Sequence, residues 1–123
     1  MDNAWCAVRE GGVVIILGEC CEGSGSALYE KTMCECRTPE IVAKKLKDNF
    51  QIGAHKAYAV TRLMKKARFI LVSTLDPELA KTLLFTPAKD MDEAFRMAAE
   101  IVGPSPHIVL MPQGSLTVPL IKD

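Results

Sequence analysis

The chain has no excess charge of either sign, no long apolar run and only two histidines. Its 123 residues carry 15 basic and 15 acidic side chains, and no basic cluster exceeds a pair of lysines. Nucleic acid is therefore not an expected partner, because it requires a concentrated positive face. The longest apolar run, residues 13–17, falls far short of the ~20 residues that span a bilayer. The N-terminus also lacks a basic region followed by an apolar core, so we expect no membrane association and no export.

The cysteine pattern indicates the redox compartment and bears on metal binding. Five cysteines, an odd number, argue against a disulfide scaffold and favour a reducing cytoplasm. The pairs Cys20-Cys21 and Cys34-Cys36 lack the spacing of about two to four residues that structural zinc sites use. Buried, unreactive thiols are the preferred interpretation, and we expect no metal site in this chain.

Short apolar runs rich in β-branched residues predict the strands. Residues 13–17 are typical of a strand that is buried on both faces in the middle of a parallel sheet. Residues 69–72 and 107–111 repeat the pattern, and residues 85–86 predict a brief strand. Helical spacing of apolar residues separates these runs. The alternation predicts an α/β fold, a three-layer α/β/α sandwich around a small, mostly parallel, Rossmann-like sheet. One core, and so a single domain over residues 1–123, is expected at this length.

Capping residues mark where the predicted helices begin and end. Thr38-Pro39-Glu40 combines a capping hydroxyl, a proline in the first turn and a favourable carboxylate. Asp76-Pro77 opens a short helix through residue 83, and Asp90 with Glu93 forms a capping box for a helix that Gly103 stops. A short helix or an irregular segment is expected over residues 27–36. A further helix is expected over residues 54–66, and it is expected to pack through Ala57, Tyr58, Thr61, Met64 and Ala67. A stripe of apolar residues is expected on the helix that begins at Thr38, formed by Ile41, Val42, Leu46 and Phe50.

The first ten residues have the pattern of a helix end. Ala4, Trp5 and Val8 lie at helical spacing, and Gly11-Gly12 is predicted to supply a left-handed C-cap. Two turns of helix are marginal alone. We therefore interpret residues 1–10 as the end of a truncated helix, and the chain as part of a longer protein.

The glycine-rich segment after the first strand is the leading candidate for a ligand loop. Ligands bind at the carboxyl ends of strands in open α/β sheets, which is where Glu22, Gly23, Ser24, Gly25 and Ser26 would lie. The segment is not a phosphate-binding Walker loop, and it departs from the dinucleotide fingerprint at Leu28, where a small residue is required. A direct phosphate contact, another ligand-facing role and a tight turn that needs positive φ angles all remain open.

The two histidines differ in their setting. His107 opens an apolar strand and is expected at the rim of the sheet. His55 follows Gly53 at a helix N-terminus beside Lys56, where the helix dipole favours a neutral ring and backbone donors converge on an anion. A carboxylate-binding role is one interpretation, and an ordinary helix start is the other. No arrangement of serine, histidine and acid in the sequence forms a catalytic triad.

The order of these landmarks resembles the C-terminal domain of the lactate racemase-like family. The resemblance is carried by residues 11–16 (GGVVII), 22–26 (EGSGS), 52–57 (IGAHKA), 69–72 (FILV), 90–99 and 109–114 (VLMPQG), and it covers nearly the whole chain. It implies a two-domain isomerase whose active site lies between the domains. The family's nickel-pincer nucleotide takes a hydride from C2 of a 2-hydroxy acid, and histidine bases handle the hydroxyl proton.

The same resemblance places the nickel ligand, the cofactor-attached lysine and the catalytic histidines in an N-terminal domain that this sequence does not contain. The isolated chain is therefore expected to be inactive and to bind no cofactor. Glu22 to Gly25, His55 and Lys56 are expected to form a substrate-binding wall that completes the site. His55 falls near a substrate-proximal tryptophan of the family, which implies a larger or more polar 2-hydroxy acid than lactate.

Two other classes of function stay open beside the racemase or epimerase interpretation. One is a stand-alone α/β module that binds a small molecule or anion. The other is a purely structural or oligomerisation domain. The structural interpretation predicts that changing Glu22, Ser24, His55 and Lys56 leaves the kinetics of the whole enzyme unchanged.

Overall fold

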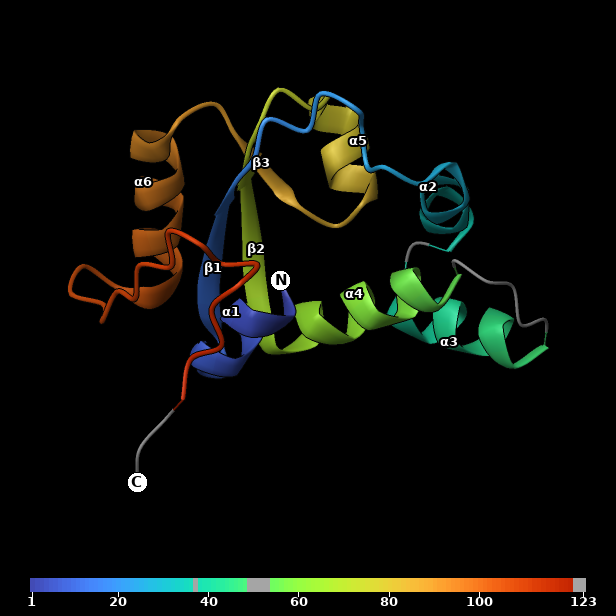
Figure 1. The fold of residues 1–123 in the computed structure, drawn as a ribbon, viewed down its shortest axis with the longest axis horizontal. Helices are drawn as coiled ribbons and strands as arrows, with labels where there is room; N and C mark the ends of the chain where they lie inside the picture. Colours follow the sequence, from blue (N-terminus) through green and yellow to red (C-terminus); the bar gives the residue numbers. More distant parts are fainter. Residues whose placement is uncertain (37, 49–53, 121–123) are drawn as a thin grey trace.

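The computed structural model describes residues 1–36, 38–48 and 54–120 of the chain. These residues form six helices and three strands, arranged as Figure 1 shows. In chain order the elements are α1 (Asp2–Ala7), β1 (Gly12–Leu17), α2 (Ala27–Glu35), α3 (Pro39–Asp48), α4 (Ala54–Lys66), β2 (Ala67–Val72), α5 (Pro77–Thr82), β3 (Thr86–Ala88) and α6 (Met91–Val102). No helix in these ranges is both long and apolar enough to cross a membrane.

The three strands form a parallel sheet in the order β1-β2-β3. Val14 lies opposite Phe69 across the first pair, and Ile70 lies opposite Thr86 across the second. The predicted parallel sheet is confirmed. The prediction that residues 13–17 occupy its middle is wrong for the described residues, because β2 pairs on both sides and β1 is an edge strand.

Helices cover both faces of the sheet, as Figure 1 shows. On one face Ile70 packs with Ala94 of α6, and Val13 and Ile15 lie against the same cluster. On the opposite face Val14 and Phe69 pack against α4, with side chains of α1 beside them. The apolar character of β1 on both faces thus follows from its cover by α6 and α1. The predicted three-layer architecture is confirmed.

A second group of buried side chains lies beyond the sheet. It joins α2, α3, α4 and α5 through Tyr29, Met33, Cys36, Val42, Ala57, Val60 and Leu83. Figure 1 shows α2 and α3 on the part of the molecule farthest from the sheet, which they reach through α4 and α5. The helices α2, α3, α4 and α5 are called here the helical extension. After β1 the chain enters it at α2 and returns to the sheet through α4, which leads into β2.

The predicted helix starts are confirmed at the atomic level. The carboxylate of Asp90 accepts a hydrogen bond from the Glu93 N–H at 2.8 Å, and that of Asp76 accepts from Leu79 N–H at 2.9 Å. The Thr38 hydroxyl accepts from the Ile41 N–H at 3.4 Å. The Glu93 carboxylate reaches back to the N–H of Lys89, one residue before the expected partner, at 2.7 Å. Gly103 ends α6 with a φ of 88°.

The strand predicted over residues 107–111 does not form. His107 is exposed and in no sheet, and Ile108, Val109 and Leu110 are 60%, 64% and 81% exposed. A strand needs a backbone ladder, and both observed pairings of the sheet are made among β1, β2 and β3. The β-rich apolar pattern indicated strand propensity, but no described strand pairs with this segment.

Smaller expectations also fail. Of the stripe predicted on α3, Val42 is buried whereas Ile41 is 50% exposed; Phe50 lies outside the described residues, and so does the side chain of Leu46. On α4, Tyr58 was expected to pack but is 44% exposed. Leu63 is instead among the most buried residues of α4, because this helix packs both against the sheet and against the other helices of the helical extension.

The N-terminal segment is helical, as predicted, but it ends earlier. Helix α1 stops at Ala7, and Val8 is already extended. Gly11, with a φ of 75°, serves the turn before β1 and does not cap the helix. The Lys66 ammonium lies 4.3 Å from the centroid of the Trp5 ring and donates to the Trp5 carbonyl oxygen at 2.9 Å. These contacts hold α1 against the end of α4, and the truncation of this helix stays a prediction.

Gly12 lies where the turn and β1 meet, and it has no room for a side chain. A Cβ there would lie 2.6 Å from Cγ2 of Val8 and 2.9 Å from the carbonyl oxygen of Arg9. We expect Gly12→Ala to lower the free energy of unfolding by about 1–3 kcal/mol, as overpacking does. Gly18→Ala is the matched control, because its Cβ would meet only the Cys20 sulfur at 3.6 Å. Equal urea midpoints for the two variants would contradict the expectation.

Candidate functional site

The carboxyl ends of the three parallel strands lie at one edge of the sheet. Residues 18–26 leave β1 there, residues 73–76 leave β2, and Lys89 and Asp90 lead from β3 into α6. The first two segments are tied together, because the Thr74 hydroxyl and N–H donate to the Glu19 carbonyl oxygen at 2.6 Å and 3.1 Å. This edge is where open α/β sheets bind ligands.

The segment over residues 18–26, called here the glycine loop, is folded by left-handed residues. Cys20, Gly23 and Gly25 have φ angles of 56°, 68° and 70°. The N–H of Gly23 closes a turn on the carbonyl oxygen of Cys20 at 3.0 Å. The tight turn with positive φ angles, one of the alternatives left open by the sequence, is therefore present. It does not exclude a ligand role.

The hydrogen bonds of the glycine loop leave some backbone donors without a partner. Ser24 N–H donates to the Glu30 carboxylate at 3.2 Å, and the Ser26 hydroxyl caps α2 by accepting from the N–H of Tyr29 at 3.3 Å. Among the described residues, the N–H groups of Glu22 and Gly25 have no acceptor. Unpartnered donors in a turn of this kind suit an anionic ligand.

Helix α4 brings a cation to the glycine loop. The Lys56 ammonium donates to the Ser24 carbonyl oxygen at 3.2 Å and lies 5.0 Å from the centroid of the Tyr29 ring. An ammonium has three donors, so the Ser24 contact leaves capacity for a ligand. Lys56 is exposed, as is Glu22 on the loop.

Of the predicted substrate-binding residues, the structure brings Ser24 and Lys56 together, with Gly23 and Gly25 shaping the turn beside them. His55 is the second residue of α4, so its backbone adjoins Lys56 at the helix start. The side chain of His55 lies outside the described residues, and so does Gly53. A substrate contact by His55 therefore stays a prediction.

Tyr29 lies beneath this contact and is buried, with 3% of its surface exposed. Its hydroxyl has no hydrogen-bond partner among the described residues. Burial raises the pKa of Tyr29 to about 12, because the phenolate is poorly solvated there. Sequence reasoning missed this residue, since an aromatic at a helical apolar position indicates only core.

The raised pKa of Tyr29 predicts a pH dependence of stability. In the unfolded chain the phenol ionises near pH 10, whereas the folded protein keeps the proton to about pH 12. Stability is therefore lost as pH rises through this window, by about 1.4 kcal/mol per pH unit at most. Tyr29→Phe lacks this contribution. The free energy of unfolding of Tyr29→Phe, minus that of the parent, should therefore increase from pH 10 to 12.

Urea titrations of both proteins across this pH range provide the measurement, because the lysines titrate alike in the two. Tyr58→Phe is the control, since Tyr58 is 44% exposed. A constant gap for Tyr29→Phe between pH 10 and 12 would mean that the phenol is accessible to water in the folded protein.

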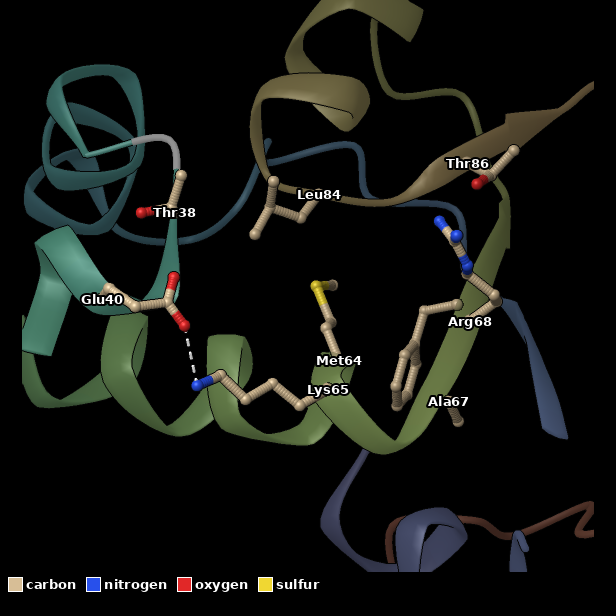
Figure 2. Close-up of a pocket in the computed structure, with 9 residues that line it drawn as sticks. Thr38, Glu40, Met64, Lys65, Ala67, Arg68, Leu84 and Thr86 are labelled. Atoms are coloured by element: carbon tan, nitrogen blue, oxygen red, sulfur yellow. Dashed lines mark ion pairs between the residues drawn. The ribbon is translucent and has the colours of Figure 1, made fainter. Parts of the chain in front are cut away.

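The cavity shown in Figure 2 is lined by no residue of the glycine loop. It has a volume of about 370 Å³ and is lined by Thr38, Glu40, Met64, Lys65, Ala67, Arg68, Phe69, Leu84 and Thr86. These residues surround the amino-terminal half of β2, where β3 has not yet begun to pair. Glu40 and Lys65 pair across one side at 2.8 Å, which lowers the pKa of the Glu40 carboxyl. The glycine loop lies at the carboxyl edge of the parallel strands, where open α/β sheets bind ligands, so we place the candidate site there.

The cysteines do not behave as a group. Cys36 is buried, as expected, whereas Cys6, Cys21 and Cys34 are exposed. The prediction that the thiols are buried is thus wrong for these three, because α1, the glycine loop and α2 present them to solvent. In the ranges that the structure describes, no three His, Cys, Asp or Glu side chains gather to hold a metal ion.

Comparisons with known proteins agree with one another. A sequence model of the family described as "Lactate racemase C-terminal domain" matches residues 1–118. A lactate racemase of Thermoanaerobacterium thermosaccharolyticum is 30% identical over 113 residues, which are 88% of this chain and 26% of that protein. The structure of the lactate racemase apoprotein from the same organism matches with a TM-score of 0.75 and 30% identity, over 83% of this chain and 26% of that one. The chain thus spans 26% of the relatives that it matches.

Proposed function

Because this chain belongs to the lactate racemase C-terminal domain family, we propose that it forms one wall of an active site that interconverts the stereoisomers of a 2-hydroxy acid. The proposal assigns the substrate carboxylate to the glycine loop and Lys56, and it assigns the reacting machinery to an N-terminal domain of the same polypeptide. The isolated chain would be inactive.

The observation that carries this assignment is the contact between Lys56 and Ser24. It fixes an ammonium on the glycine loop, in which the N–H groups of Glu22 and Gly25 have no acceptor within the described part of the chain. A carboxylate is stabilised by such a group of donors through charge-assisted hydrogen bonds. The position at the carboxyl edge of the strands supports the same role.

The chemistry of a 2-hydroxy acid limits what this wall can do. Inversion at C2 requires that the hydrogen leave C2 and return to either face. If it leaves as hydride while the hydroxyl group loses its proton, a planar 2-keto acid lies between the two events. Binding the carboxylate holds C1 while C2 changes geometry, which is a positioning role. Neither Lys56 nor the glycine loop takes part in bond breaking in this proposal.

The nickel-pincer nucleotide is a separate part of the proposal. The described residues do not fit a nickel site, because no three potential ligands gather among them. We therefore assign the cofactor to the remainder of the polypeptide and route no step of the reaction through residues of this chain.

The test is a stereoisomer-exchange assay on the full polypeptide that contains this domain. We expect a single enantiomer of a 2-hydroxy acid to be converted to a mixture, and solvent deuterium to be absent from C2 if the hydrogen returns as hydride. Candidate acids should include lactate and larger or more polar homologues.

Conversion of none of these acids, with the cofactor loaded, would contradict the proposal. Binding of a carboxylic acid by this chain alone, with millimolar or tighter affinity, would instead favour the stand-alone binding module. Both outcomes are measurable by chiral chromatography and calorimetry respectively.

A further inference from the structure

The segment after α6, residues 104–120 and called here the tail, has an unusual surface. It contains no Asp, Glu, Lys or Arg, although these four make up 24% of the chain. Its large apolar side chains face solvent, with 60–88% of their surface exposed: Ile108, Val109, Leu110, Leu116, Val118 and Leu120. Monomeric proteins rarely leave so many apolar side chains together in water.

The tail is held in place on the domain. The side-chain amide of Asn3 donates to the carbonyl oxygens of Gly114 and Ser115, at 3.0 Å and 3.2 Å. The N–H groups of Leu116 and Thr117 both donate to the Gln113 carbonyl oxygen, at 2.9 Å and 3.0 Å. Figure 1 shows the tail running past α1, to which these bonds tie it. The turn over residues 113–117 is therefore held beside α1.

The composition of the tail fits the centre of a protein interface. Interface cores are depleted in charged residues and enriched in apolar ones, whereas a solvated surface is not. Elsewhere apolar side chains such as Trp5 of α1, Val14 of β1 and Ala94 of α6 pack in the sheet layers described above. The tail has no such cover among the described residues, and no Asp, Glu, Lys or Arg side chain to solvate it.

We infer that the tail is the surface by which this domain docks onto the preceding part of the racemase polypeptide. This inference rests on the proposed function, which places an N-terminal domain before residue 1. The proposed N-terminal domain would be joined to this chain at α1, and Asn3 of α1 holds the tail beside that helix. A partner joined to the same polypeptide competes at high effective concentration, which favours it over a second copy of the chain. The partner surface is expected to be apolar and uncharged.

Amide hydrogen exchange on the full polypeptide tests the docking. We expect the amides of residues 108–118 to exchange at least about tenfold more slowly than an unstructured peptide of the same sequence. In the double variant Leu110→Asp, Leu116→Asp these amides should exchange at least about tenfold faster than in the parent. The reason is that two charges would be buried in an apolar interface. The control is Ile41→Asp, since Ile41 is 50% exposed on α3, a helix that Figure 1 shows far from the tail. It should leave the protection unchanged.

Two results would overturn the inference. One is rapid exchange of the tail in the unmodified full polypeptide, which needs no variant to fold. The other is protection that disappears on dilution together with a dimer seen by sedimentation, which would make a second copy the partner. Racemisation is measured separately. An unprotected tail in an active enzyme would therefore overturn the docking inference and leave the proposed function standing. A protected tail in a polypeptide that converts no 2-hydroxy acid removes only the proposed function.

Discussion

Phe69→Ala should lower the free energy of unfolding by about 3–5 kcal/mol, the usual range for a buried phenylalanine. Phe69 is 2% exposed on the central strand β2, and its ring meets that of Phe85 edge to face at 6.5 Å between centroids. The side chain also touches the cluster that joins the sheet to α4 and α1. A loss of this size is a large part of the total, which is about 5–15 kcal/mol for a domain. Urea unfolding followed by circular dichroism gives the measurement.

Phe95→Ala is the matched control, because Phe95 lies on α6 and is 42% exposed. It should cost less than about 1 kcal/mol, close to the range of surface substitutions. Phe69→Leu should cost about 1.5 kcal/mol or less, since most of the volume is kept. Similar losses for the two alanine variants would mean that the layer between β2 and α4 is not tightly packed.

The parts of the fold that the sequence predicts are those fixed by local chemistry. Asp90 and Asp76 each cap a helix within three residues, so the signal and the structure lie in the same short segment. The strands β1 and β2 are likewise recognisable from apolar runs that need cover on both faces. The three-layer architecture follows from this alternation without knowledge of long-range contacts.

The errors arise where a distant partner decides the outcome. Residues 107–111 have the same apolar character as β2, yet they pair with no strand and lie exposed. Strand propensity is expressed only where a neighbouring ladder is available, and the sequence does not say which edge is free. The edge position of β1 was missed for the same reason. Gly11 looked like a helix cap, whereas the turn before β1 is what requires its φ of 75°.

The candidate site was predictable in outline only. Glycines after a buried strand indicated the loop, and a lysine at a helix start indicated the cation. The contact between Lys56 and Ser24 depends on the fold of the helical extension, which places α4 beside the loop over a separation of 32 positions. The burial of Tyr29 beneath them depends on the same packing, so no local pattern could reveal it.

In the full polypeptide, Lys56→Met is expected to lower kcat/KM for the 2-hydroxy acid by about ten- to a hundredfold. The reason is the loss of a hydrogen bond to a charged group, which is worth about 1.5–3 kcal/mol. Because the proposed contact is to the carboxylate, which keeps its charge throughout the reaction, most of the effect should fall on KM. Lys56→Arg should recover part of the loss, since the guanidinium restores the charge with a different donor geometry.

Lys44→Met is the control for this change, because Lys44 is exposed on α3, away from the glycine loop. It should leave both constants within about twofold. Lys56 also lies over the Tyr29 ring, a contact worth about 0.5–1 kcal/mol at an exposed site, so urea unfolding must accompany the kinetics. If Lys56→Met is stable and its KM matches that of the parent, the ammonium does not contact substrate. The glycine loop would then serve to join β1 to α2, as the structural interpretation holds.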